Sequence, residues 1–298
     1  MTNLSEEEDN THEEDDEDDN NQNESNGAVE YPGSVLPDNN QQEIEADVDL
    51  TAGLDPDTEF IDLVHLKINS LEDLNLSRFR KLESLCLRQN LITSITLVNL
   101  ENLYFVANKI KEIKNLGTLT KLVNLELGGN KIEVIENLEN LVNITQLWLG
   151  KNRIHKLQNL DALVNLRVLS IQSNRIRKIE GLENLKSLEE LYLSHNGIEK
   201  IENLETNTNL QVLDVTSNKI KELSGLKHLT KLTDFWCSYN QVSSFENVGK
   251  ELGKLPDLEC VYFEGNPIQT ENPTAYRRKL KLYLGPSLNK IDATYIHG

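Results

Sequence analysis

The chain has 298 residues and a formal net charge of −19, but eighteen of its Asp and Glu residues, and no Lys or Arg, fall within residues 1–50. The rest of the chain is nearly neutral and lacks the basic surface that nucleic acid requires. No apolar run reaches the ~18 residues of a membrane span, and the first residues lack the basic and apolar regions of a secretory signal. We therefore expect an intracellular protein that neither spans a membrane nor contacts nucleic acid directly.

The first segment, residues 1–55, is rich in acidic and polar residues and nearly free of large apolar side chains. Such a composition cannot bury enough apolar surface to offset the conformational entropy lost on folding. We expect a disordered acidic tail. It either keeps the protein soluble or contacts a basic surface, on a partner or on the chain's own repeats.

Asparagines then recur at a fixed spacing. Six successive steps of 22 residues lead from Asn108 to Asn240. Leucines stand eight, five and three residues before Asn130, and isoleucines stand two and five residues after it. This is the L-x-x-L-x-L-x-x-N-x-I pattern of leucine-rich repeats. The full ladder consists of Asn90, Asn108, Asn130, Asn152, Asn174, Asn196, Asn218, Asn240 and Asn266.

The spacing also predicts the path of the chain. Residues five and three before each Asn alternate as in a strand and point into the core, whereas those six, four and two before it point onto the open face. Each Asn lies in a turn, where its amide can pair with backbone groups. The sequence therefore predicts an α/β leucine-rich-repeat solenoid over residues 56–265, with a curved parallel sheet on its concave face and short helical or 3₁₀ turns on its convex face.

The two ends differ from the regular repeat. Residues 60–76 fit a degenerate first repeat, in which the apolar positions are Ile61, Leu63, Ile68, Leu71 and Leu74. At the other end, an expanded step of 26 residues precedes Asn266. We expect residues 266–298 to form a C-terminal leucine-rich-repeat cap that covers the last open edge of the core. Its amphipathic helix begins at Tyr276 and ends near Leu284, and its later pattern comprises Pro286, Leu288, Ile291 and Tyr295.

Patterns of catalytic or metal-binding residues are missing. The glycine pairs lack the spacing of a phosphate loop, the histidines fall in separate repeat positions, and no Ser, Cys or Lys has an evident activating partner. Cys86, Cys237 and Cys260 are too few and too widely spaced for a disulfide framework or a zinc site. We therefore expect no enzymatic activity, no metal and no cofactor.

Aromatic and acidic residues gather in the column four residues before each Asn, while Glu190, Asp234 and Cys260 stand six before it. Adjacent parallel strands lie ~4.8 Å apart, so the column predicts a continuous row on the concave face. Aromatic residues exposed in a row are common anchors of protein interfaces, although they could also serve only to enlarge contact between strands. The column comprises Cys86, Tyr104, Glu126, Trp148, Ser170, Tyr192, Asp214, Trp236 and Tyr262.

A second stripe, directly after the asparagines, is basic. It comprises Lys109, Lys131, Arg153, Arg175 and Lys219, interrupted by Gly197 and Gln241. It is either a solvated edge that keeps the solenoid soluble or a surface for an acidic partner, including the chain's own tail.

These residues resemble the leucine-rich nuclear regulatory subunits of protein phosphatase 1, a family with 22-residue repeats. The resemblance covers about residues 60–298 and extends beyond the repeat consensus. It includes LCLRQNLI at 85–92, LGKNRIHKLQNLDAL at 149–163, ELYLSHNGIE at 190–199 and the YRRKL…IDATYI ending. The ending is similar to a cap also found in the spliceosomal leucine-rich protein of the U2 particle.

The resemblance implies that the concave face binds the phosphatase catalytic subunit. The residues matched by position are Tyr104, Glu126, Trp148, Asp234, Trp236 and Tyr262. Together with Tyr192 and Asp214 of the same row, they form the candidate partner-binding set. As in the family, the short basic-Val-x-Phe docking motif of most phosphatase regulators is missing.

Further expectations come from the same resemblance. They are a second partner in a small disordered phosphatase inhibitor, a location in nucleus and cytoplasm, and roles in phosphatase maturation, nuclear targeting and mitotic chromosome segregation. Outside the complex we expect a monomer.

One step departs from the family. Asn90 and Asn108 are only 18 residues apart, where the family has about two more repeats. We expect either a shortened, strained connection or a break in the chain at Ile95-Thr96.

A different class of function is also open. A leucine-rich-repeat scaffold of a ribonucleoprotein, such as the spliceosomal U2 particle, has the same cap. That protein has far fewer repeats, and the acidic residues of the concave row disfavour contact with phosphates.

Overall fold

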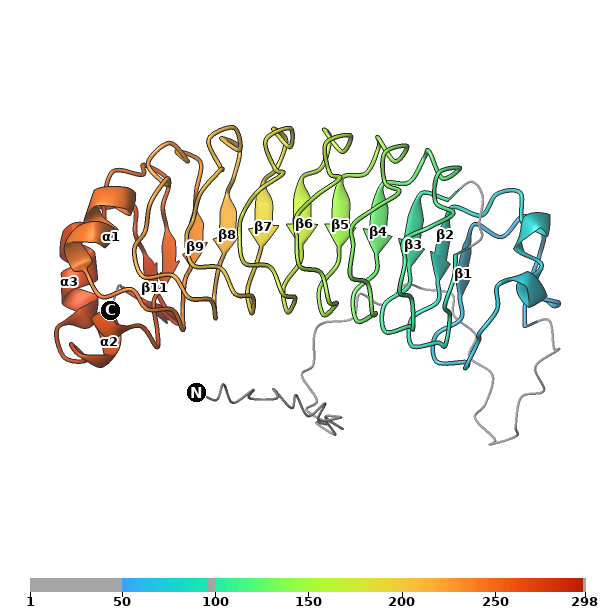
Figure 1. Ribbon diagram of the computed structural model, residues 1–298, viewed down its shortest axis with the longest axis horizontal. Coiled ribbons are helices and arrows are strands. Elements are labelled where there is room, and N and C mark those ends of the chain that lie inside the picture. The colour runs from blue at the N-terminus through green and yellow to red at the C-terminus, as the bar shows by residue number, and fades with distance from the viewer. Residues whose placement is uncertain (1–49, 96–99, 297–298) are drawn as a thin grey trace, which may run out of the picture. The chain divides into compact units, whose positions relative to one another are not determined.

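The computed structural model describes residues 50–95 and 100–296 of the chain. Within this part, the strands form one sheet in which spatial order follows chain order (Figure 1). Neighbours are parallel from β1 to β11, and β12 returns antiparallel to β11. The strands are β1 (Phe60–Asp62), β2 (Ser84–Cys86), β3 (Asn102–Tyr104), β4 (Asn124–Glu126), β5 (Gln146–Trp148), β6 (Val168–Ser170), β7 (Glu190–Tyr192), β8 (Val212–Asp214), β9 (Asp234–Trp236), β10 (Cys260–Tyr262), β11 (Lys290–Ile291) and β12 (Thr294–Tyr295).

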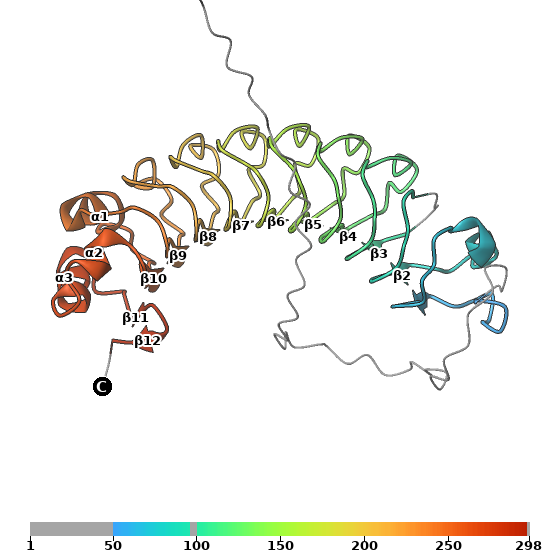
Figure 2. The ribbon, with the colours of Figure 1, turned by 60° about the horizontal axis from the view of Figure 1, so that its bottom comes forward.

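Each repeat strand is three residues long, and its middle side chain enters the core. In β5, Leu147 is fully buried, whereas Gln146 is exposed and Trp148 is partly buried on the open face. The repeat strands lie along the inner side of the curve, and the connecting loops lie along its outer side (Figure 2). The predicted leucine-rich-repeat solenoid with a concave parallel sheet is confirmed.

The asparagine ladder links each repeat to the one before it. The Nδ2 atom of Asn130 donates to the carbonyl oxygens of Phe105 at 2.8 Å and Leu127 at 2.9 Å. Its Oδ1 atom accepts from the Ile110 N–H at 3.0 Å. These are backbone groups that the turn leaves unpaired inside the protein, so the amide replaces the water they would otherwise bind. The predicted structural role of this residue is therefore borne out at Asn130.

The convex side is built from tight turns. The Leu119 N–H donates to the Leu116 carbonyl at 2.8 Å, and the Leu122 N–H donates to the Leu119 carbonyl at 3.0 Å. These i-to-i+3 bonds close single turns. Among the described residues, 3₁₀ helices occur only near the start of the solenoid, at Glu72–Leu74 and Leu76–Arg78.

The expanded repeat contains a helix, α1 (Phe245–Leu252), whose N-cap Ser244 accepts a hydrogen bond from the Asn247 N–H. No helix of the described residues has the length and apolar character needed to cross a membrane.

The sheet and the ladder both continue across the 18-residue step. Ser84 pairs with Asn102 in register, and the Ile92 N–H donates to Asn108 Oδ1 at 3.0 Å. The four-residue difference is therefore absorbed outside the strands and the ladder turn. The strain or chain break expected at Ile95-Thr96 involves residues 96–99, which lie outside the described residues.

At the N-terminal end, the burial of the first repeat matches the prediction. Ile61, Leu63, Ile68, Leu71 and Leu74 are all buried. The packed structure begins earlier than residue 56, however. Thr51 is fully buried, and its hydroxyl donates to the Leu74 carbonyl at 2.8 Å. The rest of the predicted acidic tail, residues 1–49, lies outside the described residues.

The C-terminal cap contains α2 (Pro267–Thr270) and α3 (Tyr276–Tyr283), close to the predicted helix bounds. Helix α3 packs against α1, where a Cβ on Gly253 would lie only 2.4 Å from the Tyr283 carbonyl oxygen. Leu288 and Ile291 are buried as expected. Tyr295 is different, because 69% of its surface is exposed although the sequence pattern grouped it with the apolar cap residues.

Candidate partner-binding surface

The predicted row is a geometric feature of the concave face. Because the strands pair in register, the last residue of each strand lies directly beside the last residue of its neighbours. The series therefore runs without interruption through Cys86, Tyr104, Glu126, Trp148, Ser170, Tyr192, Asp214, Trp236 and Tyr262. Asp234 begins the strand that ends in Trp236, so it lies in the adjacent column.

Four rings of this row form a chain of contacts over the C-terminal half of the sheet. The centroids of Trp148 and Tyr192 are 6.4 Å apart with an angle of 19° between the ring planes. Tyr192 lies 6.1 Å from Trp236, and Trp236 lies 6.1 Å from Tyr262. Offset and edge-on pairs at such distances are favourable.

Two of these contacts cross an intervening strand. Ser170 separates Trp148 from Tyr192, and Asp214 separates Tyr192 from Trp236. Both intervening residues are short and buried, with Ser170 only 1% and Asp214 only 8% exposed. The rings thus lean toward each other above them. The alternation of large and small residues turns separate aromatic positions into one continuous surface.

Carboxylates flank this surface and are held by short-range hydrogen bonds. The Tyr192 hydroxyl donates to Glu190 Oε2 at 2.7 Å. Burial, reinforced by that bond and by the nearby acidic charge, raises the pKa of Tyr192. Asp214 Oδ1 accepts from the Thr216 N–H at 2.9 Å. A partly covered cluster of acidic groups therefore surrounds the rings.

The N-terminal part of the row has a different electrostatic character. The Arg88 guanidinium lies 5.0 Å from the Tyr104 ring centroid and 2.6 Å from Glu126 Oε2. Burial lowers the pKa of Arg88, but the charge and hydrogen bond of Glu126 outweigh this and raise it overall. Glu126 already has a cationic partner within the chain. Sequence reasoning missed Arg88, which stands two residues before Asn90; its column also faces the concave side.

Neither indole N–H of the row has a hydrogen-bond partner among the described residues. Trp148 Nε1 and Trp236 Nε1 are covered by surrounding atoms, and neither donates a hydrogen bond to a described residue. An indole N–H can only donate, and leaving a covered donor unpaired costs free energy. Two such donors lie in the same row, at the positions that sequence reasoning selected as binding anchors.

The cysteines provide no activated nucleophile. Burial raises the pKa of Cys86 to about 11 and that of Cys260 to about 12, so both thiols stay protonated near neutral pH. Cys237 is fully buried, and burial raises its pKa as well. The described residues contain no group of three or more His, Cys, Asp or Glu side chains that could hold a metal ion.

The basic stripe lies on the edge where the strands end. The backbone N–H of Lys131 donates to the Ile110 carbonyl at 2.8 Å, which fixes the turn, and the side chain is exposed. Lys109, Arg153, Arg175 and Lys219 are likewise exposed. None of the five side chains forms an ion pair with another described residue.

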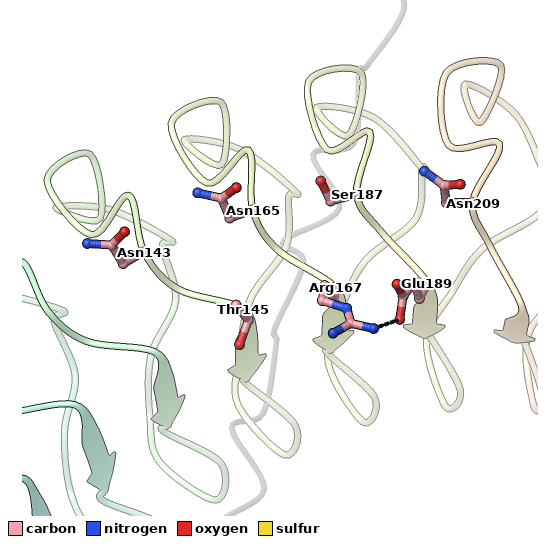
Figure 3. A pocket seen from close by; sticks show the side chains of 7 residues that line it. All are labelled: Asn143, Thr145, Asn165, Arg167, Ser187, Glu189 and Asn209. Atoms are coloured by element: carbon pink, nitrogen blue, oxygen red, sulfur yellow. Dashed lines mark hydrogen bonds and ion pairs between the residues drawn. The ribbon is translucent and has the colours of Figure 1, made fainter.

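A pocket of about 520 Å³ lies on the opposite edge, where the strands begin (Figure 3). An ion pair of 2.7 Å between Arg167 and Glu189 crosses it. Asn165 Nδ2 donates to the Val142 carbonyl at 3.0 Å, so this amide also braces the backbone of the preceding repeat. Sequence reasoning did not predict this pocket. Its lining residues are Asn143, Thr145, Asn165, Arg167, Ser187, Glu189 and Asn209.

Comparison with known proteins agrees with the repeat assignment. The family described as Leucine Rich repeats (2 copies) matches residues 164–206 and 208–250. A leucine-rich-repeat protein of Leptospira interrogans superimposes with a TM-score of 0.61 at 23% identity, over 77% of this chain and 59% of that one. Internalin C2 of Listeria monocytogenes gives a TM-score of 0.56 at 27% identity, over 59% of this chain and 80% of that one.

Two curated relatives carry the name protein phosphatase 1 regulatory subunit SDS22. The Saccharomyces cerevisiae protein is 54% identical over 93 residues, which is 29% of this chain and 28% of that protein. The Schizosaccharomyces pombe protein is 59% identical over 46 residues, or 15% of this chain and 14% of that protein. The matched stretches span less than a third of each relative. The resemblance to leucine-rich phosphatase regulatory subunits is confirmed over these stretches, and both names denote a regulatory subunit and no enzyme.

Proposed function

We propose that this protein is a non-catalytic regulatory subunit that binds the catalytic subunit of protein phosphatase 1 through its concave face. The observation that carries the proposal is the unbroken chain of ring contacts through Trp148, Tyr192, Trp236 and Tyr262 on that face. The names of the two curated relatives supply the identity of the partner.

The row has the composition of an interface centre. Trp and Tyr are the residues most enriched among those that dominate binding free energy, and they act best where neighbouring contacts exclude water. The rings here are partly buried by their neighbours before any partner arrives. Their ordering therefore costs little further conformational entropy on binding. The two unpaired indole N–H groups would gain acceptors if the side chains turn toward a partner.

The acidic residues favour a partner with basic groups opposite the C-terminal half. Glu190, Asp214 and Asp234 surround Tyr192 and Trp236, and none of the three is in an ion pair with another described residue. Glu126 is different because Arg88 already binds it. We therefore expect the C-terminal half of the row to contribute more to affinity than Tyr104 and Glu126.

Calorimetric titration of the full chain with the purified catalytic subunit tests the proposal. We expect Trp236→Ala to weaken binding at least about tenfold, or about 1.4 kcal/mol. The variant should stay folded, because the neighbouring core positions are occupied by the fully buried Phe235 and Cys237. Lys131→Ala, on the basic stripe, is the matched control and should change affinity little.

Three results would count against the proposal. If the wild-type chain does not bind the catalytic subunit, the phosphatase is not its partner. Equal affinity of the wild type and Trp236→Ala would remove the concave row as the binding surface. Equal losses from Trp236→Ala and Lys131→Ala would move the interface toward the edge of the solenoid.

A further inference from the structure

The concave surface does not end at Tyr262, because the cap adds two strands to the same sheet. Strand β11 pairs in parallel with β10, with Lys290 opposite Cys260, and β12 pairs antiparallel with β11, with Tyr295 opposite Lys290. The column that contains Asp234 and Cys260 therefore continues through Lys290 to Tyr295. Figure 2 shows β11 and β12 next to β10 at the C-terminal end of the sheet.

Lys290 lies between two aromatic rings. Its Nζ atom is 5.5 Å from the ring centroid of Tyr262 and 5.9 Å from that of Tyr295. Tyr262 is in turn 6.1 Å from Trp236. The ring contacts of the candidate surface are thus extended by a cation and a further tyrosine, neither of which was among the predicted site residues.

The hairpin is fixed by the cap helix even though Tyr295 faces solvent. Arg277 of α3 donates to the carbonyl oxygens of Ile291 at 2.8 Å and Thr294 at 3.1 Å. Asp292, which has a positive φ of 50°, accepts from the Tyr276 hydroxyl and from the Phe263 N–H. These bonds hold the backbone around Tyr295 in place. An aromatic side chain that is 69% exposed on a braced turn is presented to a partner at little cost in entropy.

The charge of Lys290 contrasts with the acidic groups nearby. Arg88, the cation over Tyr104 at the other end of the row, has Glu126 as an internal partner. Lys290 has no carboxylate of the described residues within ion-pair distance. A cation on an aromatic face is attracted by the rings, which orients it while its charge stays available to an anion.

We propose that the β11–β12 hairpin is part of the partner-binding surface, and that Lys290, between Tyr262 and Tyr295, binds a carboxylate of the phosphatase catalytic subunit. This inference rests on the proposed function, which supplies the partner, and it adds a position of opposite charge at the end of the acidic row. The partner should then have basic groups opposite Asp214 and Asp234 and an acidic group beyond them.

The test compares four variants of the full chain by calorimetry with the purified catalytic subunit. Tyr295→Ala removes the exposed ring, and Lys290→Met removes the charge but keeps the aliphatic stem. The matched controls come from the outer face of α3: Leu282→Ala removes a side chain that is 81% exposed, and Lys281→Met removes a charge in the last turn of that helix. Because Tyr295 and Leu282 are both exposed, we expect unchanged melting temperatures for their variants.

We expect Tyr295→Ala and Lys290→Met each to weaken binding at least about fivefold, with the controls within about twofold of the wild type. Affinity is measured at about 50 mM and about 200 mM salt, since screening weakens charge pairs. Raising the salt concentration should weaken the binding of Lys290→Met less than it weakens the binding of the wild type. For Tyr295→Ala, the same rise in salt should weaken binding as much as it does for the wild type.

Several outcomes would overturn the inference. If Trp236→Ala loses affinity while Tyr295→Ala and Lys290→Met bind within twofold of the wild type, the hairpin lies outside the interface and the proposed function stands. If the affinity of Lys290→Met depends on salt as strongly as that of the wild type, Lys290 does not bind a carboxylate of the partner. If Leu282→Ala weakens binding as much as Tyr295→Ala, the effect does not belong to the hairpin. If the wild-type chain does not bind the phosphatase, the proposed function and this inference fail together.

Discussion

The asparagine ladder offers a sharp test of what holds the solenoid together, and Asn152 is a suitable position. It is buried, and its amide makes bonds in both directions. Nδ2 donates to the carbonyl oxygens of Leu127 at 2.9 Å and Leu149 at 3.0 Å. Oδ1 accepts from the Ile132 N–H at 3.0 Å. Replacement by Ala removes these bonds, together with a longer one from Nδ2 to the Gly150 carbonyl at 3.4 Å, and leaves no polar atom on the side chain.

These losses are not equivalent. The Leu127 carbonyl also accepts from Asn130, and the Leu149 carbonyl also accepts from Asn174. Each therefore loses one of two bonds, at about 0.5–1.5 kcal/mol. The buried Ile132 N–H has no second acceptor among the described residues, and an unsatisfied buried donor costs about 1–3 kcal/mol. We expect Asn152→Ala to lower the free energy of unfolding by about 2–6 kcal/mol in total.

Equilibrium unfolding in urea, followed by far-ultraviolet circular dichroism, measures this change. The control is Asn143→Ala in the same repeat, an exposed side chain with one bond, to the Thr120 carbonyl at 2.8 Å. Its loss should stay below about 1 kcal/mol, as is usual for surface substitutions. If Asn152→Ala costs no more than Asn143→Ala, the ladder does not stabilise the fold in the way its hydrogen bonds indicate.

Two further predictions concern the ends of the chain. Deleting residues 266–298 exposes Leu258, Val261 and Phe263, which are almost fully buried. Because burial of such side chains contributes ~1.5–3 kcal/mol each, we expect unfolding or aggregation. A soluble truncation with a cooperative melting transition would contradict the role of the cap. Deleting residues 1–49 should leave the melting temperature within a few degrees of that of the full chain. Deleting residues 1–55 should lower it further, because Thr51 and its bond to Leu74 are lost. Equal melting temperatures for the two deletions would show that this bond contributes nothing to stability.

The regular repeats could be predicted because one physical constraint recurs every 22 residues. A side chain such as Leu147 must be buried, and the Asn in the turn after each strand must pair with backbone groups of that turn. Both residue types are therefore required in each repeat of the solenoid. The same frame correctly placed Trp148, Tyr192 and Trp236 on one face. Their partner-binding role stays a prediction, as do the nuclear and cytoplasmic location and the second, inhibitor partner.

Features outside the period could not be predicted in the same way. The sequence predicts only an expanded step before Asn266, whereas the structure has helix α1 in it, packed against α3 where Gly253 leaves room for the Tyr283 carbonyl. The contact of Trp148 with Tyr192 across Ser170 depends on side-chain direction, which spacing alone does not give. The exposure of Tyr295 depends on the hairpin that Arg277 holds, a tertiary contact.

The order of charges along the row gives the proposed complex a direction. Arg88 already binds Glu126 toward the N-terminal end. Asp214 and Asp234 near the other end have no cationic partner within the described part of the chain, and Lys290 follows them. A partner with basic groups opposite Asp214 and an acidic group opposite Lys290 fits in one orientation. In the reverse orientation, the partner's acidic group would face Asp214 and its basic groups would face Lys290. Such like-charge contacts disfavour that orientation. The rings that extend from Trp148 to Tyr262 carry no net charge, so they discriminate between the two directions less than the flanking charges do. We therefore infer that the aromatic residues supply affinity and the flanking charges set orientation.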